Sequence, residues 1–334
     1  MKRLKQSEKR RIYGLDSLRF LAFLMVFLFH SSEIFFFGFL GVDFFFVLSS
    51  FLLTYLAFTE IEKTGSFSRR NFFLRRVLRI FPLYYLIVFF SFVILPFLAE
   101  KAGIAITLPE KEWYFWTFLS NYDNSHYLLP LKFLWSIAVE EQFYLLFLLL
   151  SIFFRKHFWY IIGSLLLGYV IFMISEGYFG WERYKSVFLH LVNFAFGMAA
   201  GYLFYLGRLK FKKRILLPGL LLSFILLFPT VKIAILFNLL LSLFFVLLIF
   251  SITHFGQKLA RNYIFRITEY LGKYTYGLYV YSGFIIVFFN KLLSPGSRIL
   301  IILIALIALF LVAFLSYHLY EKHFLKLKKY FRKV

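Results

Sequence analysis

The amino-acid sequence predicts an all-α polytopic membrane protein with about ten transmembrane helices. Of its 334 residues, 62% are hydrophobic and 24% are aromatic, whereas soluble domains are about 45–50% apolar. The mean hydropathy of the chain is +0.80. Ten apolar runs of roughly 15–24 residues approach the ~20 residues that cross a bilayer core. These runs begin near Gly14, Phe36, Ile80, Phe133, Phe158, Ser186, Ile215, Ile233, Tyr274 and Arg298.

The first run follows the basic stretch MKRLKQSEKRR and lacks a small-residue cleavage site. We therefore expect an uncleaved first span rather than a signal peptide. Residues 100–132 form the sizeable segment outside the spans, and their aromatic residues are typical of a membrane interface. We expect this segment to dip into the membrane or to lie over a pocket. Residues 1–334 are interpreted as one integral-membrane domain, without an appended soluble domain, that ends in a basic amphipathic tail.

The distribution of basic residues orients the predicted helices. With ten spans both termini lie on the same side, and the segments on that side hold 29 Lys and Arg against 8 on the other. Cytoplasmic loops carry the excess of basic residues, so both termini are predicted to be cytoplasmic. The net charge of +22 then follows mainly from topology. Because no basic region accompanies a soluble recognition fold, the charge does not indicate nucleic-acid binding.

The composition also bears on redox and metal chemistry. The chain contains no cysteine, which excludes disulfides and thiolate chemistry. No metal site is predicted, because most histidines are scattered among loops and interfaces. These histidines, interpreted as structural or surface residues, are His126, His157, His190, His254, His318 and His323.

Two ionisable residues lie in the first span, where a charge without a partner is costly. Arg19 and His30 are eleven residues apart, which at 1.5 Å per residue corresponds to about 16 Å along a helix. Eleven residues are close to three turns, so both side chains face the same side. Arg19 is predicted toward the cytoplasm and His30 in the outer half of the membrane.

Three acidic residues are predicted at a depth similar to that of His30. Asp43 lies near the outer end of the second span, and Glu140 and Glu141 lie in the outer half of the fourth. A carboxylate beside an imidazole sets its tautomer and stabilises its protonated form, which suits a general base for a hydroxyl acceptor. We predict that His30 meets Asp43 and at least one glutamate. A buried structural network is the alternative.

An arginine cluster precedes the third span in SRRNFFLRRVLRIFPLYY. Arg75, Arg76 and Arg79 fall on about one helical turn, close to the depth of Arg19. Arginines beside a span commonly set topology, and that explanation is the simpler one. However, a cluster that can meet Arg19 only through an anion favours a phosphate-bearing cytosolic ligand, because guanidinium groups match phosphate oxygens.

Six blocks of the sequence together resemble the membrane-bound acyltransferase family 3, bacterial proteins that O-acylate surface glycans and related acceptors. The blocks follow the family's order over nearly the whole chain and include its arginine-ten-residues-histidine pattern at Arg19 and His30. They read YGLDSLRFLAFLMVFLFH, GFLGVDFFFVLSSFLLT, FLRRVLRIFPLYY, LWSIAVEEQFYLL, LGKYTYGLYVYSGF and SYHLYEKHF.

The resemblance implies a ten-helix O-acyltransferase in the bacterial cytoplasmic membrane. The implied donor is acyl-CoA from the cytoplasm, most often acetyl-CoA, with no metal. The implied acceptor is a hydroxyl of an extracytoplasmic polysaccharide or lipid-linked sugar. The residues implied to hold the donor's phosphates or line its entry are Arg19, Arg75, Arg76 and Arg79.

The same resemblance assigns the catalytic residues. His30 would be the base, Asp43 corresponds to the acid of the family's Gly-Val-Asp-x-Phe-Phe segment, and Glu140 and Glu141 match its Trp-Ser-x-x-x-Glu-Glu block. We hypothesise direct transfer from the thioester to an acceptor hydroxyl, with apolar walls excluding water. A covalent relay through acyl-histidine or acyl-serine is the weaker variant. Its candidate serines are Ser49, Ser50 and Ser136.

Two positions depart from the family pattern. Ser50 stands where the second-span block usually has a glycine, which is expected to alter helix packing more than chemistry. Ser282 stands where the ninth-span block usually has a histidine. Because of Ser282, we expect an altered preference for the acceptor or the donor, or a loss of activity.

Two further interpretations stay open. Ten spans with buried charges also describe a transporter or exporter of a glycan or a small anionic solute, although inverted halves are not evident in the sequence. The second open interpretation is a catalytically inactive relative that serves as a membrane scaffold. The sequence does not identify the acceptor: a sugar is the commonest implication of the resemblance, and a lipid or an antibiotic also fits. The length of the acyl chain is not identified either.

Overall fold

The protein is mainly helical in the part of the chain that the computed structural model describes. That part comprises residues 12–31, 35–125, 129–175, 181–207, 219–224, 234–292 and 298–331, and it contains no strand. Its principal helices are α1 (Leu15–Ser31), α2 (Leu40–Thr64), α3 (Arg69–Phe89), α4 (Leu95–Lys101), α7 (Leu134–Leu150), α8 (Phe154–Ser175), α10 (Leu191–Tyr205), α12 (Ala234–Leu259), α13 (Tyr263–Leu271), α14 (Thr275–Leu292), α15 (Arg298–Ser316) and α16 (Lys322–Leu327).

Shorter elements join these helices. Single turns of α-helix are α5 (Trp113–Trp116), α6 (Leu129–Lys132) and α9 (Trp181–Tyr184). The 3₁₀ segments are η1 (Phe36–Phe39), η3 (Ser120–Tyr122), η4 (Ser151–Phe153), η5 (Gly272–Tyr274) and η7 (Lys328–Phe331). Two π-helical turns, η2 (Phe90–Ile94) and η6 (Tyr317–Glu321), continue α3 into α4 and α15 into α16.

Five helical stretches are long and apolar enough to cross a membrane. They are Phe36–Thr64, Arg69–Lys101, Pro130–Ser175, Ala234–Leu259 and Ile299–Phe331, and Leu191–Tyr205 is a shorter apolar helix. The all-α, multi-pass membrane class is therefore confirmed. Within the described residues, helices lie at nine of the ten expected spans. The expected span at 215–229 lies largely outside the described residues, so the count of ten and the cytoplasmic termini stay predictions.

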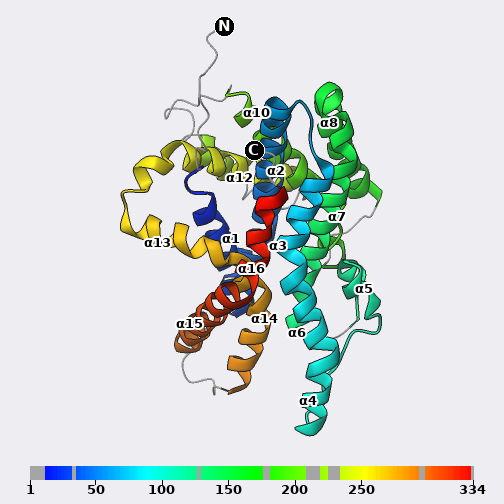
Figure 1. Ribbon diagram of the computed structural model, residues 1–334, viewed down its shortest axis with the longest axis vertical. Coiled ribbons are helices and arrows are strands. Elements are labelled where there is room, and N and C mark those ends of the chain that lie inside the picture. The colour runs from blue at the N-terminus through cyan, green and yellow to red at the C-terminus, as the bar shows by residue number, and fades with distance from the viewer. Residues whose placement is uncertain are drawn as a thin grey trace.

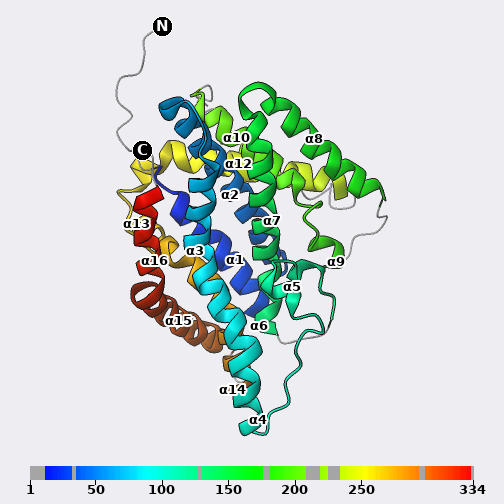
Figure 2. The same cartoon turned by 45° about the vertical axis from the view of Figure 1, so that its right-hand side comes forward.

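The helices form an elongated bundle with two distinct ends (Figures 1 and 2). Phe331 and the first turns of α3 lie at one end, where Arg75 Nη1 donates to the Phe331 carbonyl at 2.8 Å. We call this the terminal end. α4 and α6 lie toward the opposite end in both views. Because α1 runs between the two ends, Arg19 and His30 lie at different levels of the bundle.

Helices α2 and α10 pack closely against each other. A Cβ on Gly197 of α10 would lie 2.4 Å from the Val47 carbonyl oxygen, and one on Gly201 would lie 2.3 Å from that of Phe51. Only glycine allows backbones to approach this closely, as small residues do at membrane helix interfaces. Ser50 is fully buried in this contact and its hydroxyl donates to the carbonyl of Phe46 at 2.9 Å. The glycines of α10 thus leave room for the Ser50 side chain on α2.

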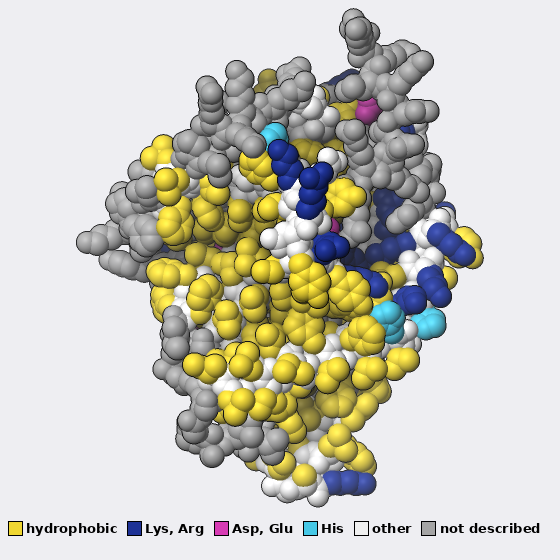
Figure 3. Space-filling view, turned by 90° about the vertical axis from the view of Figure 1, so that its left-hand side faces the viewer, with side chains coloured by type: hydrophobic (Ala, Val, Ile, Leu, Met, Phe, Trp, Pro, Cys, Tyr) yellow, Lys and Arg dark blue, Asp and Glu magenta, His cyan; other side chains and the backbone are white. Residues whose placement is uncertain are grey.

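The outer surface of α15 is apolar along its length. Exposed side chains recur on one face, including Leu303 (51% exposed), Ile307 (62%) and Leu311 (60%). A spacing of four residues places them on one side of the helix. Figure 3 shows a broad hydrophobic area on this side of the molecule, with Lys and Arg side chains gathered beside it. This surface is the lipid-facing wall expected of a membrane protein.

The segment between α4 and α7 packs against the opposite end of the bundle. The hydroxyl of Tyr84 donates to the Phe115 carbonyl at 2.7 Å, and that of Tyr85 donates to the Trp116 carbonyl at 3.0 Å. Figure 2 places α5, α6 and α9 close together beside the lower part of α7. Two α3 tyrosines thus anchor the segment that the sequence predicted to lie over a pocket.

Candidate active site

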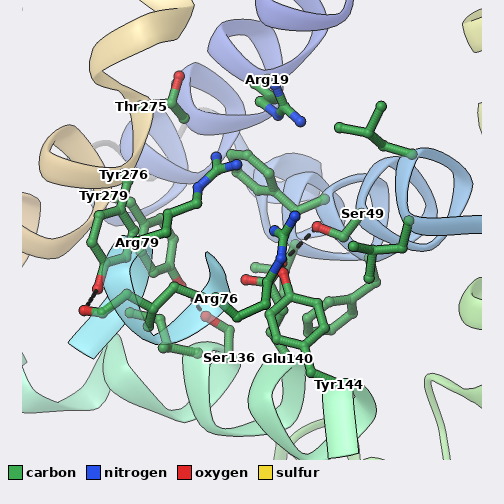
Figure 4. A pocket seen from close by; sticks show the side chains of 17 residues that line it. Arg19, Ser49, Arg76, Arg79, Ser136, Glu140, Tyr144, Thr275, Tyr276 and Tyr279 are labelled. Atoms are coloured by element: carbon green, nitrogen blue, oxygen red, sulfur yellow. Dashed lines mark hydrogen bonds between the residues drawn. The ribbon is translucent and has the colours of Figure 1, made fainter. Parts of the chain in front are cut away.

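A cavity of about 90 Å³ lies within the bundle toward the terminal end. We call it the inner cavity. Arg19 of α1 and Arg76 and Arg79 of α3 line it, and Figure 4 shows their side chains converging. Arg76 and Arg79 are three residues apart and therefore share one face of α3. Three like charges repel one another in a low-dielectric interior, so this arrangement favours an anion.

Arg19 is held in place by the contact between α1 and the segment after α13. A Cβ on Gly272 would lie 2.0 Å from the Asp16 carbonyl oxygen, so glycine is required for this approach. The amide and hydroxyl of Ser17 both donate to Glu269 Oε2 at 3.1 Å. Arg19 Nη1 in turn donates to Asp16 Oδ1 at 2.6 Å. The LGKY block therefore fixes the start of α1, and with it the direction of Arg19.

Arg75 does not join the other three arginines in lining the inner cavity. Its Nη2 donates to Glu60 at 3.2 Å, and its Nη1 binds the Phe331 carbonyl. These contacts tie α3 to the end of α2 and to the C-terminal segment. The structure therefore groups Arg19, Arg76 and Arg79, and places Arg75 in a separate contact at the terminal end.

Glu140 faces the inner cavity. It accepts a hydrogen bond from the Ser49 hydroxyl at 2.6 Å and another from the Tyr144 hydroxyl. Among the described lining residues it is the one carboxylate beside three arginines. The sequence placed Glu140 near His30; the structure instead places it with the arginines. This difference arises because Glu140 and Arg76 share the α7–α3 interface, where Tyr144 also lies under Arg76.

The neighbouring Glu141 points elsewhere and lines neither of the cavities described in this section. Its side chain is 7% exposed, and within the described residues its Oε1 has no hydrogen-bond partner. Consecutive residues on a helix point about 100° apart, so Glu140 and Glu141 face different surroundings in this structure. A role for Glu141 in catalysis stays a prediction.

Asp43 belongs to a buried network at the opposite end of the bundle. Its Oδ1 accepts from Asn193 Nδ2 at 2.6 Å and lies 3.1 Å from His190 Nδ1, while its Oδ2 accepts from the Tyr184 hydroxyl at 2.7 Å. His190 Nε2 faces the Tyr184 carbonyl oxygen at 2.7 Å. The expected pairing of Asp43 with His30 is thus replaced by one with His190, a fully buried residue. The alternative of a buried structural network describes Asp43 in this structure.

His30 lies at the far end of α1, in a second and larger cavity of about 440 Å³ that we call the outer cavity. Its ring packs against Phe29 and against Phe133, with ring centroids 4.9 and 4.3 Å apart. Within the described residues His30 makes no hydrogen bond or ion pair. Its ring nitrogens are therefore available to a ligand that enters this cavity.

The two cavities meet at Tyr279 and Val42, which line both of them. The Tyr279 hydroxyl lies 2.5 Å from Ser136 Oγ and donates to the Phe133 carbonyl at 3.2 Å. Figure 4 shows the Tyr279–Ser136 contact at the edge of the inner cavity. Tyr279 thus separates a cationic compartment from the one that contains His30. Tyr279 was not among the residues predicted from the sequence to be functional, although it lies within the LGKYTYGLYVYSGF block.

The second departure from the family pattern, Ser282, is buried close to this junction. It is 1% exposed, and its hydroxyl donates to the carbonyl of Tyr279, one turn earlier in α14, at 2.6 Å. The hydroxyl is thus satisfied within its own helix. Ser282 therefore has a structural environment here, and its effect on activity stays a prediction.

The donor set of the inner cavity suits phosphate better than a metal. Arg76 Nε is buried and, within the described residues, has no hydrogen-bond partner. A buried guanidinium N–H without a hydrogen-bond partner fits a phosphate oxygen, since phosphate forms short charge-assisted bonds with arginine. Within the same residues there is no group of three or more His, Asp or Glu side chains that could hold a metal ion.

The size of the inner cavity limits what it can hold. Small-molecule sites usually measure about 300–1,000 Å³, so 90 Å³ admits only part of a nucleotide-sized molecule. Arg19 and His30 are separated along α1 by about 16 Å at 1.5 Å per residue. A ligand that bridges the two cavities must therefore be extended, with an anionic group at one end and a reactive group at the other.

These features define a multi-pass membrane protein with an arginine-lined anion cavity joined to a histidine-bearing cavity. The family described as "Acyltransferase domain" matches residues 12–318. The chain belongs to this family, as the resemblance of its six blocks implied.

Two curated relatives are similar over nearly half of the chain. The peptidoglycan O-acetyltransferase OatA of Listeria monocytogenes is 36% identical over 155 residues, which are 44% of this chain and 25% of that protein. The O-acetyltransferase OatA of Staphylococcus aureus is 35% identical over 162 residues, which are 46% of this chain and 27% of that protein. The matched region thus spans about a quarter of the length of these relatives. No solved structure matches this chain.

Proposed function

We propose that this chain is a membrane O-acyltransferase that moves an acetyl group from acetyl-CoA to a hydroxyl of an extracytoplasmic glycan. The observation that carries this proposal is the junction of two unlike cavities at Tyr279, with arginines on one side and His30 on the other. Membership in the acyltransferase family supports the reaction type. The names of the two relatives, one of which specifies peptidoglycan, support acetyl as the group and a glycan as the acceptor.

The inner cavity would receive the donor. Acetyl-CoA carries phosphates and a thioester at opposite ends of a flexible arm. It therefore has the extended shape of a ligand that could bridge the two cavities. Arg19, Arg76 and Arg79 would bind its phosphates, and Glu140 would keep Arg76 and Tyr144 in position. In the bacterial cytoplasmic membrane, with the terminal end facing the cytoplasm, the donor would enter from the side where acetyl-CoA is made.

The outer cavity would receive the acceptor. His30 would take the proton of the acceptor hydroxyl as that oxygen forms a bond with the thioester carbonyl carbon. The carbon–sulfur bond then breaks, and His30 returns the proton to the departing thiolate. The apolar rings of Phe29 and Phe133 beside His30 would limit access of water, which would otherwise hydrolyse the thioester.

The experiment uses the full chain in proteoliposomes, labelled acetyl-CoA on the side of the terminal end, and a bacterial glycan extract on the other side. We expect the label to reach a glycan hydroxyl, and we expect His30→Ala to lower the rate by about 10²–10⁴-fold because a positioned base contributes that much. His157→Ala is the matched control, since His157 is exposed on α8 and remote from both cavities. Full activity in His30→Ala would refute the assignment of the base. Passage of an intact glycan without label would favour an exporter.

A further inference from the structure

We infer that the outer cavity binds an uncharged sugar ring of the acceptor, and that Asp123 binds one hydroxyl of that ring. This inference rests on the proposed function and specifies its acceptor side. Asp123 belongs to none of the sequence blocks that resemble the acyltransferase family.

Asp123 is a buried carboxylate with one unused oxygen. The residue is 4% exposed and lines the outer cavity together with His30. Its Oδ1 accepts hydrogen bonds from the amide of Ser125 at 2.8 Å and from its hydroxyl at 2.6 Å. Within the described residues its Oδ2 has no hydrogen-bond partner. Buried carboxylate oxygens are rarely left without a donor, and a ligand hydroxyl in the cavity is a donor that would satisfy it.

The chain holds Asp123 firmly in this position. Lys185 Nζ, from the segment after α9, donates to the Asp123 carbonyl at 3.0 Å and to Asn124 Oδ1 at 3.2 Å. The side chain of Asn121 donates to the Lys185 carbonyl at 3.2 Å and accepts from Gln142 Nε2 of α7 at 2.7 Å. Three separate segments are thus cross-linked beside the cavity. A site ordered before the ligand arrives loses less entropy on binding.

An aromatic wall lies in the same cavity. The rings of Trp135 and Tyr184 both line it, with centroids 5.5 Å apart at an interplanar angle of 64°. Tyr184 is fixed because its hydroxyl donates to Asp43 and also to the Phe39 carbonyl at 3.1 Å. Aromatic side chains offer a large apolar face, which suits the C–H face of a pyranose ring. Asp43 therefore acts on the acceptor site as a positioning residue, through Tyr184.

The charges around the cavity select the class of sugar. Besides His30, the charged residues that line it within the described part of the chain are two lysines, Lys132 and Lys185, and two acids, Asp123 and Glu182. These opposite charges balance, so the described lining does not favour an ionic ligand. The unused oxygen of Asp123 would repel a carboxylate brought close to it. A neutral sugar ring can pack its C–H face against the aromatic wall and donate a hydroxyl to Asp123.

The test is a ligand-observed NMR titration of the full chain in nanodiscs, performed without acetyl-CoA. The probes are two uncharged oligosaccharides, chitotetraose and maltotetraose, and the charged tetragalacturonate. We expect at least one uncharged probe to bind more tightly than tetragalacturonate. Asp123→Asn should weaken that binding about tenfold to a hundredfold, as expected for loss of a hydrogen bond to a charged group. Glu110→Gln is the matched control, because Glu110 is an exposed acid in the same segment and does not line the cavity.

A second variant covers the case in which Asp123→Asn does not fold. Trp135→Leu removes the aromatic face while leaving the Asp123 segment unchanged, and it should weaken the same probe at least fivefold. Unchanged affinity in folded Asp123→Asn, or preference of the wild type for tetragalacturonate, would overturn the inference. So would the absence of binding by both uncharged probes. Because no acyl donor is present, failure of acetyl transfer would refute the proposed function separately from this site.

Discussion

The inner and outer cavities of this protein differ in how they are built. The inner cavity is small, about 90 Å³, and its polar lining comes from long helices, with three arginines facing one carboxylate. The outer cavity is about 440 Å³, and the short segments at 123–125 and 182–185 supply three of the four Lys, Asp and Glu side chains that line it within the described residues. A long helix places its side chains at fixed spacings, whereas the segments between helices tolerate changes of sequence. Helices thus wall the inner cavity, whereas shorter elements between the long helices supply most of the charge in the outer cavity.

Arg76→Ala is expected to weaken binding at the inner cavity strongly. Arg76 lines the inner cavity and its Nε lacks a partner in the described residues. Loss of its bond to a donor phosphate should raise KM for acetyl-CoA about tenfold to a hundredfold, since a hydrogen bond between charged groups contributes ~1.5–3 kcal/mol. Affinity for the acceptor should not change. Initial rates in proteoliposomes, with each substrate varied in turn, measure both quantities.

Arg75→Ala is the matched control for this prediction, because it removes the same charge one position earlier. Arg75 is bonded to Glu60 and Phe331 rather than to the inner cavity. Its replacement should change KM for acetyl-CoA by less than about threefold, the range of a partly exposed ion pair. If Arg75→Ala and Arg76→Ala had equal effects, the arginines would act as a general positive surface and the inner cavity would not be the donor site.

Sequence reasoning located the inner cavity better than the outer one. Arg19, Arg76 and Arg79 could be grouped because helix spacing and membrane depth follow directly from residue number. Their neighbour Arg75 could not be separated from them, because its direction depends on Glu60 and on the C-terminal segment, which are distant in sequence. The depth of each arginine in the membrane could therefore be predicted from the sequence, but the residue that it contacts could not.

The acidic residues show the same limit. Asp43 was predicted at the level of His30, yet its partners are Tyr184, His190 and Asn193. These residues lie in α9, α10 and the segment between them, and their approach depends on how α10 packs against α2. Asp123 gave no signal in the sequence, since a single acid in a polar segment is usually solvated. Only burial and an unused oxygen distinguish it.

An intermediate effect is expected from Asp43→Asn, which tests whether the outer cavity depends on its buried support. The amide would leave at least one buried donor of the network without a partner, which costs ~1–3 kcal/mol. Tyr184 would lose its fixed position, so KM for the acceptor should rise about fivefold, the equivalent of ~1 kcal/mol. KM for acetyl-CoA should stay the same, because Asp43 does not line the inner cavity.

Glu321→Gln is the control for Asp43→Asn. Glu321 is likewise a buried acid, bonded to the Ser316 hydroxyl at 3.0 Å, but it lines neither cavity. Both variants should lower the melting temperature, and only Asp43→Asn should change the acceptor KM. A rise in the acetyl-CoA KM with Asp43→Asn would instead mean that the two cavities are not independent sites.

The smallest expected effect comes from Tyr279→Phe, which tests the boundary between the cavities. The phenyl ring keeps the packing but loses the bonds to Ser136 and to the Phe133 carbonyl. One uncharged hydrogen bond contributes ~0.5–1.5 kcal/mol, so the barrier between the cavities should weaken only slightly. Hydrolysis of acetyl-CoA without acceptor should rise about threefold, because the acyl group that passes Tyr279 on its way to His30 would be shielded less well from water. Tyr281 lines neither cavity, and Tyr281→Phe, which removes a hydroxyl bonded to Ser316, should leave hydrolysis unchanged. If wild type and Tyr279→Phe hydrolysed acetyl-CoA equally, Tyr279 would not lie between donor and acceptor. The acyl group would then follow a path other than the one from the inner to the outer cavity.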